Sequence, residues 1–203
     1  MENPKIKATF IEKAESVSAF VYQVNTMDEA YRQTLDLCRK KKSCRDLFQK
    51  TETEKNIDSS SPKKTIAAPG LSNDLFNTFE LLCRQEKTDL VQSNLRRYTA
   101  GLDIGFTIAD FGIAETGTLV IGSDSEDTRL ATMVCDFHVA LVPESKIAAT
   151  ALDIAAPLKE MTAGPSSYTA FVTGASRTAD IERVLAIGVH GPMELHIIIL
   201  AGE

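Results

Sequence analysis

Two short polar segments near the end of the sequence combine residue types that bind anions. The first, TGASRTADIE (173–182), follows an apolar run and contains Gly174, Ser176, Arg177 and Thr178. Glycine lets a ligand approach the backbone closely, and arginine can bind a carboxylate or phosphate through two parallel hydrogen bonds. Ser176 or Thr178 could cap a following helix, whose free N–H groups would attract the same anion. The segment therefore predicts an anion site.

The same residues also have a purely structural interpretation. Asp180 and Glu182 would lie in the first turn of the predicted helix, where acids already satisfy the positive end of the helix dipole. Arg177 would then pair with one of these acids. In the ligand-binding interpretation Asp180 is itself a ligand contact, and the residues alone leave both interpretations open.

The second polar segment is the turn His190-Gly191-Pro192, followed by the apolar run ELHIIIL (194–200). His190 is a candidate for proton transfer because histidine titrates near neutral pH. Gly191 is a candidate ligand contact because it has no side chain. The alternative is an ordinary tight turn, which Gly191 and Pro192 would form whatever His190 does.

A third candidate is Glu115 in the segment AETG (114–117), which separates two apolar runs. Burial between two strands would raise the pKa of a carboxyl group and suit Glu115 to act as a general acid, a base or an acyl acceptor. Thr116 beside it is a further candidate ligand contact. A solvated acid in a hairpin turn is the competing interpretation, since Gly117 favours such a turn.

The sequence gives little support for a hydrolase, nucleotide-binding or metal site. No GxSxG, GxxxxGK[ST] or GxGxxG motif occurs. The four cysteines form no CxxC pair and the three histidines no HxH or HxxxH pair, so we expect neither a metal nor a cofactor in this chain. The cysteines are expected to be buried thiols in a reducing compartment.

The elements that must position these residues alternate between helix and strand. Helices are predicted over 7–18, from residue 26 or 28 onward, near 75–83, after residue 122, over 147–161 and over 178–185, and strands over 19–24, 65–68, 137–142, 168–173 and 194–200. The runs on either side of Glu115 are expected to be extended. Continuous apolar strands separated by helices indicate a mainly parallel sheet covered by helices on both faces, an α/β fold. Ligands of such sheets bind beyond the carboxyl ends of the strands.

Composition and charge narrow the class of protein. The 203 residues suffice for one domain, 1–203, with an N-terminal helical part at about 5–48 and a mobile loop at about 50–64. The net charge is −6, and residues 101–203 contain five basic and fourteen acidic residues, which disfavours nucleic acid as a partner. No apolar run is long enough to span a membrane. Charged residues near the N-terminus argue against a secretory signal, so we expect a cytoplasmic protein.

Three segments, in this order, closely resemble one protein family. They are GIAETGTLV (112–120), TGASRTADIE (173–182) and GVHGP followed by LHIIIL (188–200), and they resemble the LutC/YkgG-type lactate utilization proteins of the LUD-domain family. The resemblance implies a fold similar to formyltetrahydrofolate cyclo-ligases, sugar-phosphate isomerases and CoA transferases. His138 matches a histidine that the family often carries, whereas Ala175 stands where the family usually has proline.

The resemblance also implies a role in oxidising L-lactate to pyruvate together with iron-sulfur partner proteins. Under this first hypothesis the chain contains no cluster of its own and holds a small carboxylate in a crevice at the C-terminal edge of the sheet. A second hypothesis is a stand-alone enzyme of the acyl-CoA transferase type that uses Glu115. A third is a scaffold that docks an iron-sulfur subunit and binds no ligand.

Overall fold

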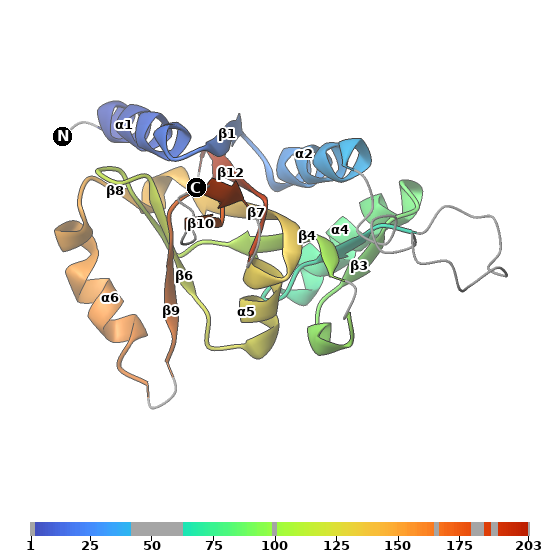
Figure 1. Cartoon of the computed structure of the whole chain (residues 1–203). Coiled ribbons are helices and arrows are strands. Elements are labelled where there is room, and N and C mark those ends of the chain that lie inside the picture. Colours follow the sequence, from blue (N-terminus) through green and yellow to red (C-terminus); the bar gives the residue numbers. More distant parts are fainter. Residues whose placement is uncertain are drawn as a thin grey trace, which may run out of the picture.

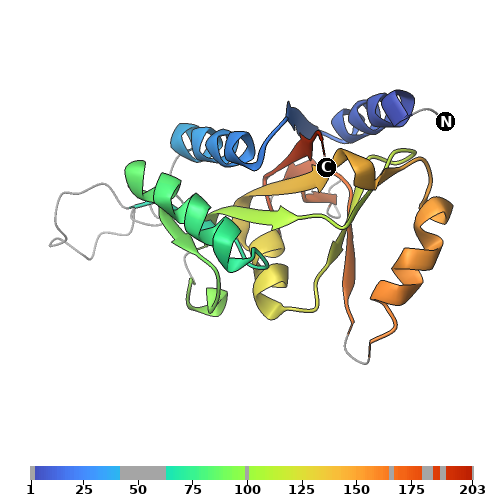
Figure 2. The ribbon, with the colours of Figure 1, turned by 180° about the vertical axis from the view of Figure 1, so that it is seen from behind.

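The fold centres on a six-stranded parallel sheet. The computed structural model describes residues 3–41, 63–98, 101–164, 167–179, 185–187 and 191–202. Strands in the main sheet follow the order β1-β12-β7-β4-β2-β3, and every neighbouring pair is parallel. Figure 1 shows the elements by label, and Figure 2 shows them from behind. The main-sheet strands are β1 (Ala19–Val24), β2 (Thr65–Ala67), β3 (Asp89–Val91), β4 (Leu102–Ile108), β7 (Cys135–Pro143) and β12 (Glu194–Leu200).

Helices α2 (Met27–Lys40) and α4 (Asn73–Gln85) cover one face of the main sheet. Thr26 begins α2 by accepting a hydrogen bond from the Glu29 N–H, and Ser72 caps α4 in the same way. Tyr31 and Phe79, one from each helix, stack with their ring centroids 4.3 Å apart. They bury the face of the sheet that carries Phe106 and its neighbours, so this layer follows the predicted α/β pattern.

The opposite face is covered by a helix and a second sheet rather than by helices alone. Helix α1 (Asn3–Ser16) buries Phe10 and Ala14 against this second, four-stranded sheet and against the main sheet. The strands of this second sheet follow the order β8-β5-β6-β9, with β5 antiparallel to β6 and β6 antiparallel to β9. Figure 1 shows β6 and β9 running beside α6, away from α2 and α4. The strands are β5 (Phe111–Ile113), β6 (Thr118–Gly122), β8 (Ile147–Ala148) and β9 (Thr169–Val172).

The helix predicted over 147–161 is only partly correct. Ile147 and Ala148 form β8, which pairs with β5, and a 3-10 turn η3 (Ala151–Ile154) then leads into α6 (Ala155–Met161). The Thr150 side chain and the Asp153 carboxylate form a capping box that starts this helical part. Pairing with β5, which lies more than thirty residues away in the sequence, overrides the local helical pattern of Ile147 and Ala148.

The helix predicted over 178–185 is wrong where the structure describes it. Arg177–Ala179 is strand β10, and it pairs in antiparallel register with β11 (Leu185–Ile187). An eight-residue helix has little stability by itself, and β-branched residues such as Thr178 and Ile187 favour an extended backbone. Arg177–Ala179 is therefore a strand where a helix was predicted to begin. The helix N-terminus that was expected to attract an anion does not form there.

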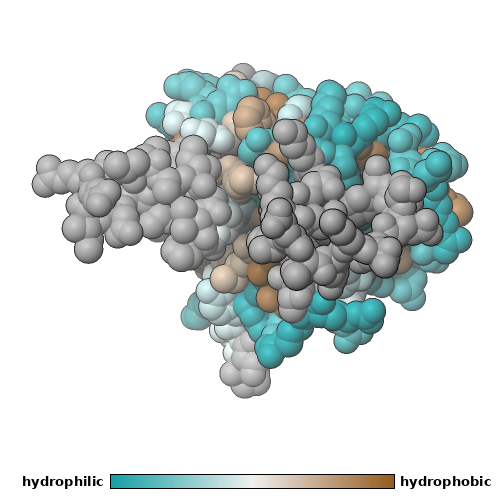
Figure 3. All heavy atoms as spheres, turned by 45° about the vertical axis from the view of Figure 1, so that its right-hand side comes forward, coloured by the Kyte–Doolittle hydropathy of each residue, from teal (hydrophilic) through white to brown (hydrophobic). Residues whose placement is uncertain are grey.

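Two further helical elements are short, and one of them, α5 (Glu126–Met133), packs against the central strands β4 and β7. The 3-10 turn η1 (Leu95–Arg97) and helix α5 are held together by Asp127, whose carboxylate accepts the Leu95 N–H. Among the described residues, no helix has the length and apolar character needed to cross a lipid bilayer. In Figure 3, which shows one face of the molecule, the coloured residues are mainly hydrophilic, with small hydrophobic areas among them. The loop expected at 50–64 falls almost entirely outside the described residues.

Candidate functional site

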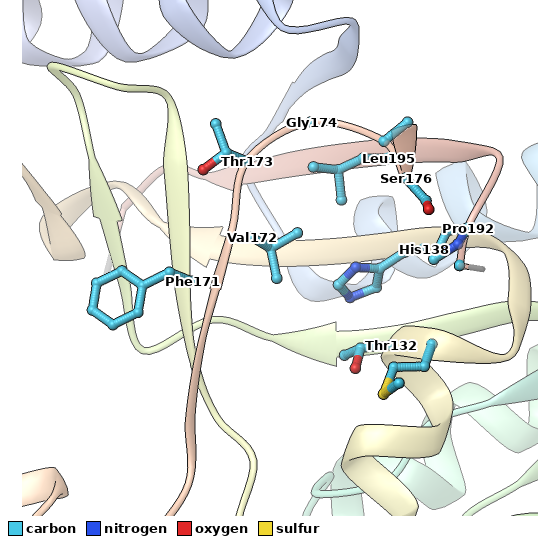
Figure 4. Close-up of a pocket in the computed structure, with 12 residues that line it drawn as sticks. Thr132, His138, Phe171, Val172, Thr173, Gly174, Ser176, Pro192 and Leu195 are labelled. Atoms are coloured by element: carbon cyan, nitrogen blue, oxygen red, sulfur yellow. The ribbon is translucent and has the colours of Figure 1, made fainter. Parts of the chain in front are cut away.

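The two polar segments meet around one cavity. Thr173 to Ser176, which follow β9, form one side, and Gly191 with Pro192, which precede β12, form another. The Ser176 N–H donates to the Pro192 carbonyl oxygen at 3.0 Å, so the two segments are joined directly. The cavity has a volume of about 370 Å³. Figure 4 shows its lining, which within the described residues is Thr132, Met133, His138, Phe171, Val172, Thr173, Gly174, Ala175, Ser176, Gly191, Pro192 and Leu195.

His138 provides the imidazole ring of this cavity. It lies on β7 beside Leu195 of β12, and only 1% of its surface is exposed. Its Nε2 lies 2.9 Å from Thr107 Oγ1 on the neighbouring strand β4. Burial, with a smaller contribution from the nearby His196, lowers the pKa of His138 to about 4. The ring is therefore neutral at pH 7, and its second nitrogen, Nδ1, has no hydrogen-bond partner among the described residues.

Ser176 adds a second polar atom to the same space. Its hydroxyl forms no hydrogen bond with any residue that the structure describes. Figure 4 shows Ser176 and Pro192 on one side of the His138 ring and Val172 on the other, while the Phe171 ring points away from His138, on the opposite side of β9. Among the described lining residues none is acidic, although the C-terminal half of the chain is strongly acidic. The cavity thus offers uncharged hydrogen-bonding groups and no carboxylate that would repel an anion.

A chain of three threonine hydroxyls ties the cavity to the hairpin between β5 and β6. Thr173 Oγ1 lies 2.7 Å from Thr118 Oγ1, which in turn lies 2.8 Å from Thr116 Oγ1. Thr116 therefore acts through two other side chains and does not itself line the cavity. This arrangement fixes the end of β9, from which the Thr173–Ser176 segment begins.

Two glycines of the recognised segments hold this region against α1. Gly174 has φ +71°, and a Cβ placed there would lie 2.3 Å from the Val17 carbonyl oxygen. Gly117 has φ +65°, and a Cβ there would lie 2.3 Å from the backbone nitrogen of Ala14. Both positions require a left-handed backbone and leave no room for a side chain. The C-terminal end of α1 and the residue after it therefore rest directly on the hairpin and on the edge of the cavity.

Glu115 lies away from the cavity, in an exposed turn. Its carboxylate accepts the Ala151 N–H at 2.8 Å and so caps the start of η3. The burial on which its predicted acid-base role depended is absent, because Glu115 is exposed. The turn itself has the hairpin form that the sequence indicates, with antiparallel β5 and β6 on either side.

The other predicted site residues are placed only in part. Gly174, Ser176 and Gly191 line the cavity. Arg177 and Thr178 are described by their backbone in β10, which follows Ser176 directly, and nothing is established about their side chains. Asp180 and His190 lie outside the described residues.

The cavity lies at an end of the main sheet different from the one expected. Leu195 is the second residue of β12, and His138 pairs with it near the beginning of β7. These are the amino ends of the two parallel strands, whereas the sequence led us to expect a crevice at their carboxyl ends. The difference arises because the strand before Gly174 belongs to the second sheet, so its carboxyl end points toward the amino ends of β7 and β12.

Sequence reasoning assigned no site role to His138, Thr107 or the apolar lining residues. A polar residue inside each of two otherwise apolar strands, GFTIAD and DFHVALV, was the available signal. The described residues contain no group of three or more histidines, cysteines or acids that could hold a metal ion. Cys38, Cys83 and Cys135 are buried free thiols, and burial raises their pKa to between about 11 and about 12.

Comparison with known proteins places this architecture in context. A family model described as the LUD domain matches residues 7–200. Lactate utilization protein C of Shouchella clausii is 32% identical over 101 residues, which cover 48% of this chain and 44% of that protein. Lactate utilization protein C of Anoxybacillus flavithermus is 36% identical over 98 residues, again 48% of this chain and 44% of the relative. These alignments span about half of the chain and less than half of the length of the curated relatives.

The fold also matches a solved structure. The crystal structure of a DUF162 family protein from Deinococcus radiodurans superposes with a TM-score of 0.59, covering 100% of this chain and 99% of that one. The two sequences are 16% identical, so the match concerns the fold.

Proposed function

Because the chain belongs to the LUD-domain family, we propose that it takes part in lactate utilization by binding a small 2-hydroxy carboxylate, such as L-lactate, in the cavity around His138. The names of the relatives support the process, since several are lactate utilization protein C. The uncharged hydrogen-bonding groups of the cavity support the ligand class. The observation that carries the proposal is that two of the three recognised segments line a single cavity in which His138 Nδ1 and Ser176 Oγ have no partner among the described residues.

The groups in the cavity suit the ligand chemically. A carboxylate accepts hydrogen bonds, and the Ser176 hydroxyl donates one; His138 can donate from Nδ1 when Thr107 donates to its Nε2. The hydroxyl group of the acid can both donate and accept, as can Thr132, which lies across the cavity. Arg177 follows Ser176 in the chain and is proposed to complete the carboxylate contact, as its sequence position predicts.

Oxidation of lactate to pyruvate also needs an electron acceptor. The reaction breaks the C–H and O–H bonds at the second carbon and releases two electrons and two protons. We propose that iron-sulfur partner proteins accept the electrons, as the family resemblance implies, and that this chain presents the acid to them. His190, by its position in the sequence, is the candidate to accept the hydroxyl proton.

Calorimetric titration of the purified protein with L-lactate tests the ligand-binding proposal. We expect saturable binding that is weakened about five- to tenfold in Ser176→Ala, because one charge-assisted hydrogen bond is lost. Ser16→Ala is the matched control, since the Ser16 hydroxyl is exposed and, among the described residues, bonds only to the Lys13 carbonyl oxygen of its own helix. Absence of lactate binding, or equal affinity in Ser176→Ala and the parent, would contradict the proposal.

A further inference from the structure

The neutral ring of His138 can carry its proton on either nitrogen, and its position decides what the ring can bind. With the proton on Nε2, the ring donates to Thr107 and offers Nδ1 as an acceptor. With the proton on Nδ1, Thr107 donates to Nε2 and the ring offers a donor. The distance of 2.9 Å between Nε2 and Thr107 Oγ1 fits both arrangements, so the surroundings of the Thr107 hydroxyl must distinguish them.

Thr107 lies inside the packed sheet, whereas His138 reaches the cavity. Thr107 is 2% exposed and is not among the described lining residues. Gly105 of β4 is directly opposite His138 of β7, and Thr107 follows Gly105 by two residues on the same face of the sheet. The register of the two strands therefore places one ring nitrogen beside a hydroxyl that is remote from the cavity.

A buried hydroxyl proton needs an acceptor. In the part of the chain that the structure describes, the Thr107 hydroxyl has no hydrogen-bond partner other than His138 Nε2. If the ring donated to Thr107, the hydroxyl proton would be unpaired in the packed interior, which is costly and rare in proteins. If Thr107 donates to the ring, the unpaired donor is Nδ1–H, on a residue that lines the cavity, where a ligand can accept from it. The second arrangement is therefore the favoured one.

We propose that Thr107 is a positioning residue that fixes the tautomer of His138, so that Nδ1–H donates a hydrogen bond to the carboxylate of the bound acid. This inference rests on the proposed function and specifies the ligand further: the group that meets His138 must accept a hydrogen bond. A carboxylate does so, and its charge strengthens the bond. A protonated Nδ1 cannot take up a proton, so His138 orients the acid and does not act as a base.

Nitrogen-15 NMR of the ligand-free protein at pH 7 tests the tautomer. Couplings between the ring nitrogens and the carbon-bound ring protons show which nitrogen is protonated, and loss of the signals in His138→Gln assigns them. We expect the proton on Nδ1 in the parent protein. Thr107→Val has a similar shape but no hydroxyl, so its ring should become a mixture of both tautomers. Thr107→Ser keeps the hydroxyl and should keep the tautomer of the parent.

Calorimetric titration of the same variants with L-lactate tests the consequence for binding. We expect the affinity to fall about five- to tenfold in Thr107→Val, because the ring is no longer held as a donor, and to stay within about twofold of the parent in Thr107→Ser. Thr34→Val is the matched control: Thr34 is also completely buried, but its hydroxyl donates to the Ala30 carbonyl oxygen within α2. It should change neither the tautomer nor the affinity.

The results distinguish failure of this inference from failure of the proposed function. A proton on Nε2 in the parent, or an unchanged tautomer in Thr107→Val, overturns the inference and leaves the proposed function standing. Equal weakening of lactate binding in Thr107→Ser and Thr107→Val also overturns it, because the hydroxyl would then have no part in binding. A parent protein that carries the proton on Nδ1 but binds no lactate contradicts the proposed function, and the carboxylate contact is rejected with it.

Discussion

At the scale of single residues, His138 stands out because an ionisable side chain is almost completely buried. Its ring is buried at the floor of the cavity, and Thr107 holds one ring nitrogen. Its other ring nitrogen has no partner among the residues that the structure describes, and a buried polar group without a partner is costly to the fold. We propose that a ligand binds at this nitrogen.

The titration of His138 makes stability depend on pH. Burial lowers its pKa to about 4 in the folded protein, against about 6.5 in the unfolded chain. Between these values the unfolded state binds the proton more readily, so the free energy of unfolding falls as pH falls from about 6.5 to about 4. The full contribution is roughly 3 kcal/mol. Burial also lowers the pKa of His196, although its hydrogen bond to Glu194 opposes this shift. Variants of each histidine are therefore needed to separate the two contributions to the pH dependence of stability.

We predict that His138→Gln is less sensitive to acid than the parent. Glutamine can still bond to Thr107 but takes up no proton, so urea unfolding measured at pH 7 and pH 5 should show a smaller loss of stability for the variant. A loss as large as that of the parent would show that His138 does not titrate in this range. His196→Gln, measured in parallel, separates the contribution of the second histidine.

Sequence reasoning found the residues of the cavity that lie in turns and missed those that lie in strands. Gly174, Ser176 and Gly191 stood out because glycine-rich polar segments interrupt apolar runs, and the structure brings them together. His138 and Thr107 are 31 positions apart and meet only through the register of β4 and β7. Strand register depends on the whole sheet, so their contact could not be read from either segment.

At the scale of elements, the parallel sheet was predictable and the second sheet was not. Continuous apolar runs such as 194–200 indicate strands buried on both faces, and β12 is an inner strand of the main sheet, between β1 and β7. In contrast, β8 and β10 are two and three residues long, and each exists because of its partner strand. Short strands of this kind carry too little local pattern to be distinguished from the start of a helix.

The contact between α1 and the edge of the cavity gives a prediction at this scale. Gly174→Ala should lower the free energy of unfolding by about 2–5 kcal/mol, because the backbone is left-handed and the new Cβ would lie against the Val17 carbonyl oxygen. Gly70→Ala is the matched control: its φ is +81°, but no other atom lies within 4 Å of the new Cβ, so only the backbone cost of about 1–2 kcal/mol is expected.

Urea unfolding measures the two losses, and hydrogen exchange locates the effect. Backbone amides of α1 should exchange faster in Gly174→Ala than in Gly70→Ala, since only the former pushes the end of α1 away. Equal losses in the two variants would mean that the close approach of Gly174 to Val17 contributes nothing to stability.

At the scale of the whole molecule, α1 connects the beginning of the chain to the part that carries the candidate site. Phe10 is completely buried between the two sheets, with its ring close to Gly112 of β5. Val17, which follows the same helix, supports Gly174 at the edge of the cavity. The first helix thus stabilises both the packing of the two sheets and the position of the Thr173–Ser176 segment.

This arrangement predicts that Phe10→Ala affects both stability and ligand binding, although Phe10 does not line the cavity. Removing a fully buried phenylalanine ring should lower the free energy of unfolding by about 3–5 kcal/mol. Weaker packing of α1 should also lower the affinity for the 2-hydroxy acid, because the Thr173–Ser176 segment then loses its contact with Val17. Leu81→Ala is the control, since Leu81 is a large apolar side chain on α4 that is 61% exposed; it should change stability by no more than about 0.5 kcal/mol. Urea unfolding and calorimetric titration of both variants give the two quantities. If Phe10→Ala loses stability but binds the acid as tightly as the parent, the cavity is organised independently of α1, and the support through Val17 must be rejected.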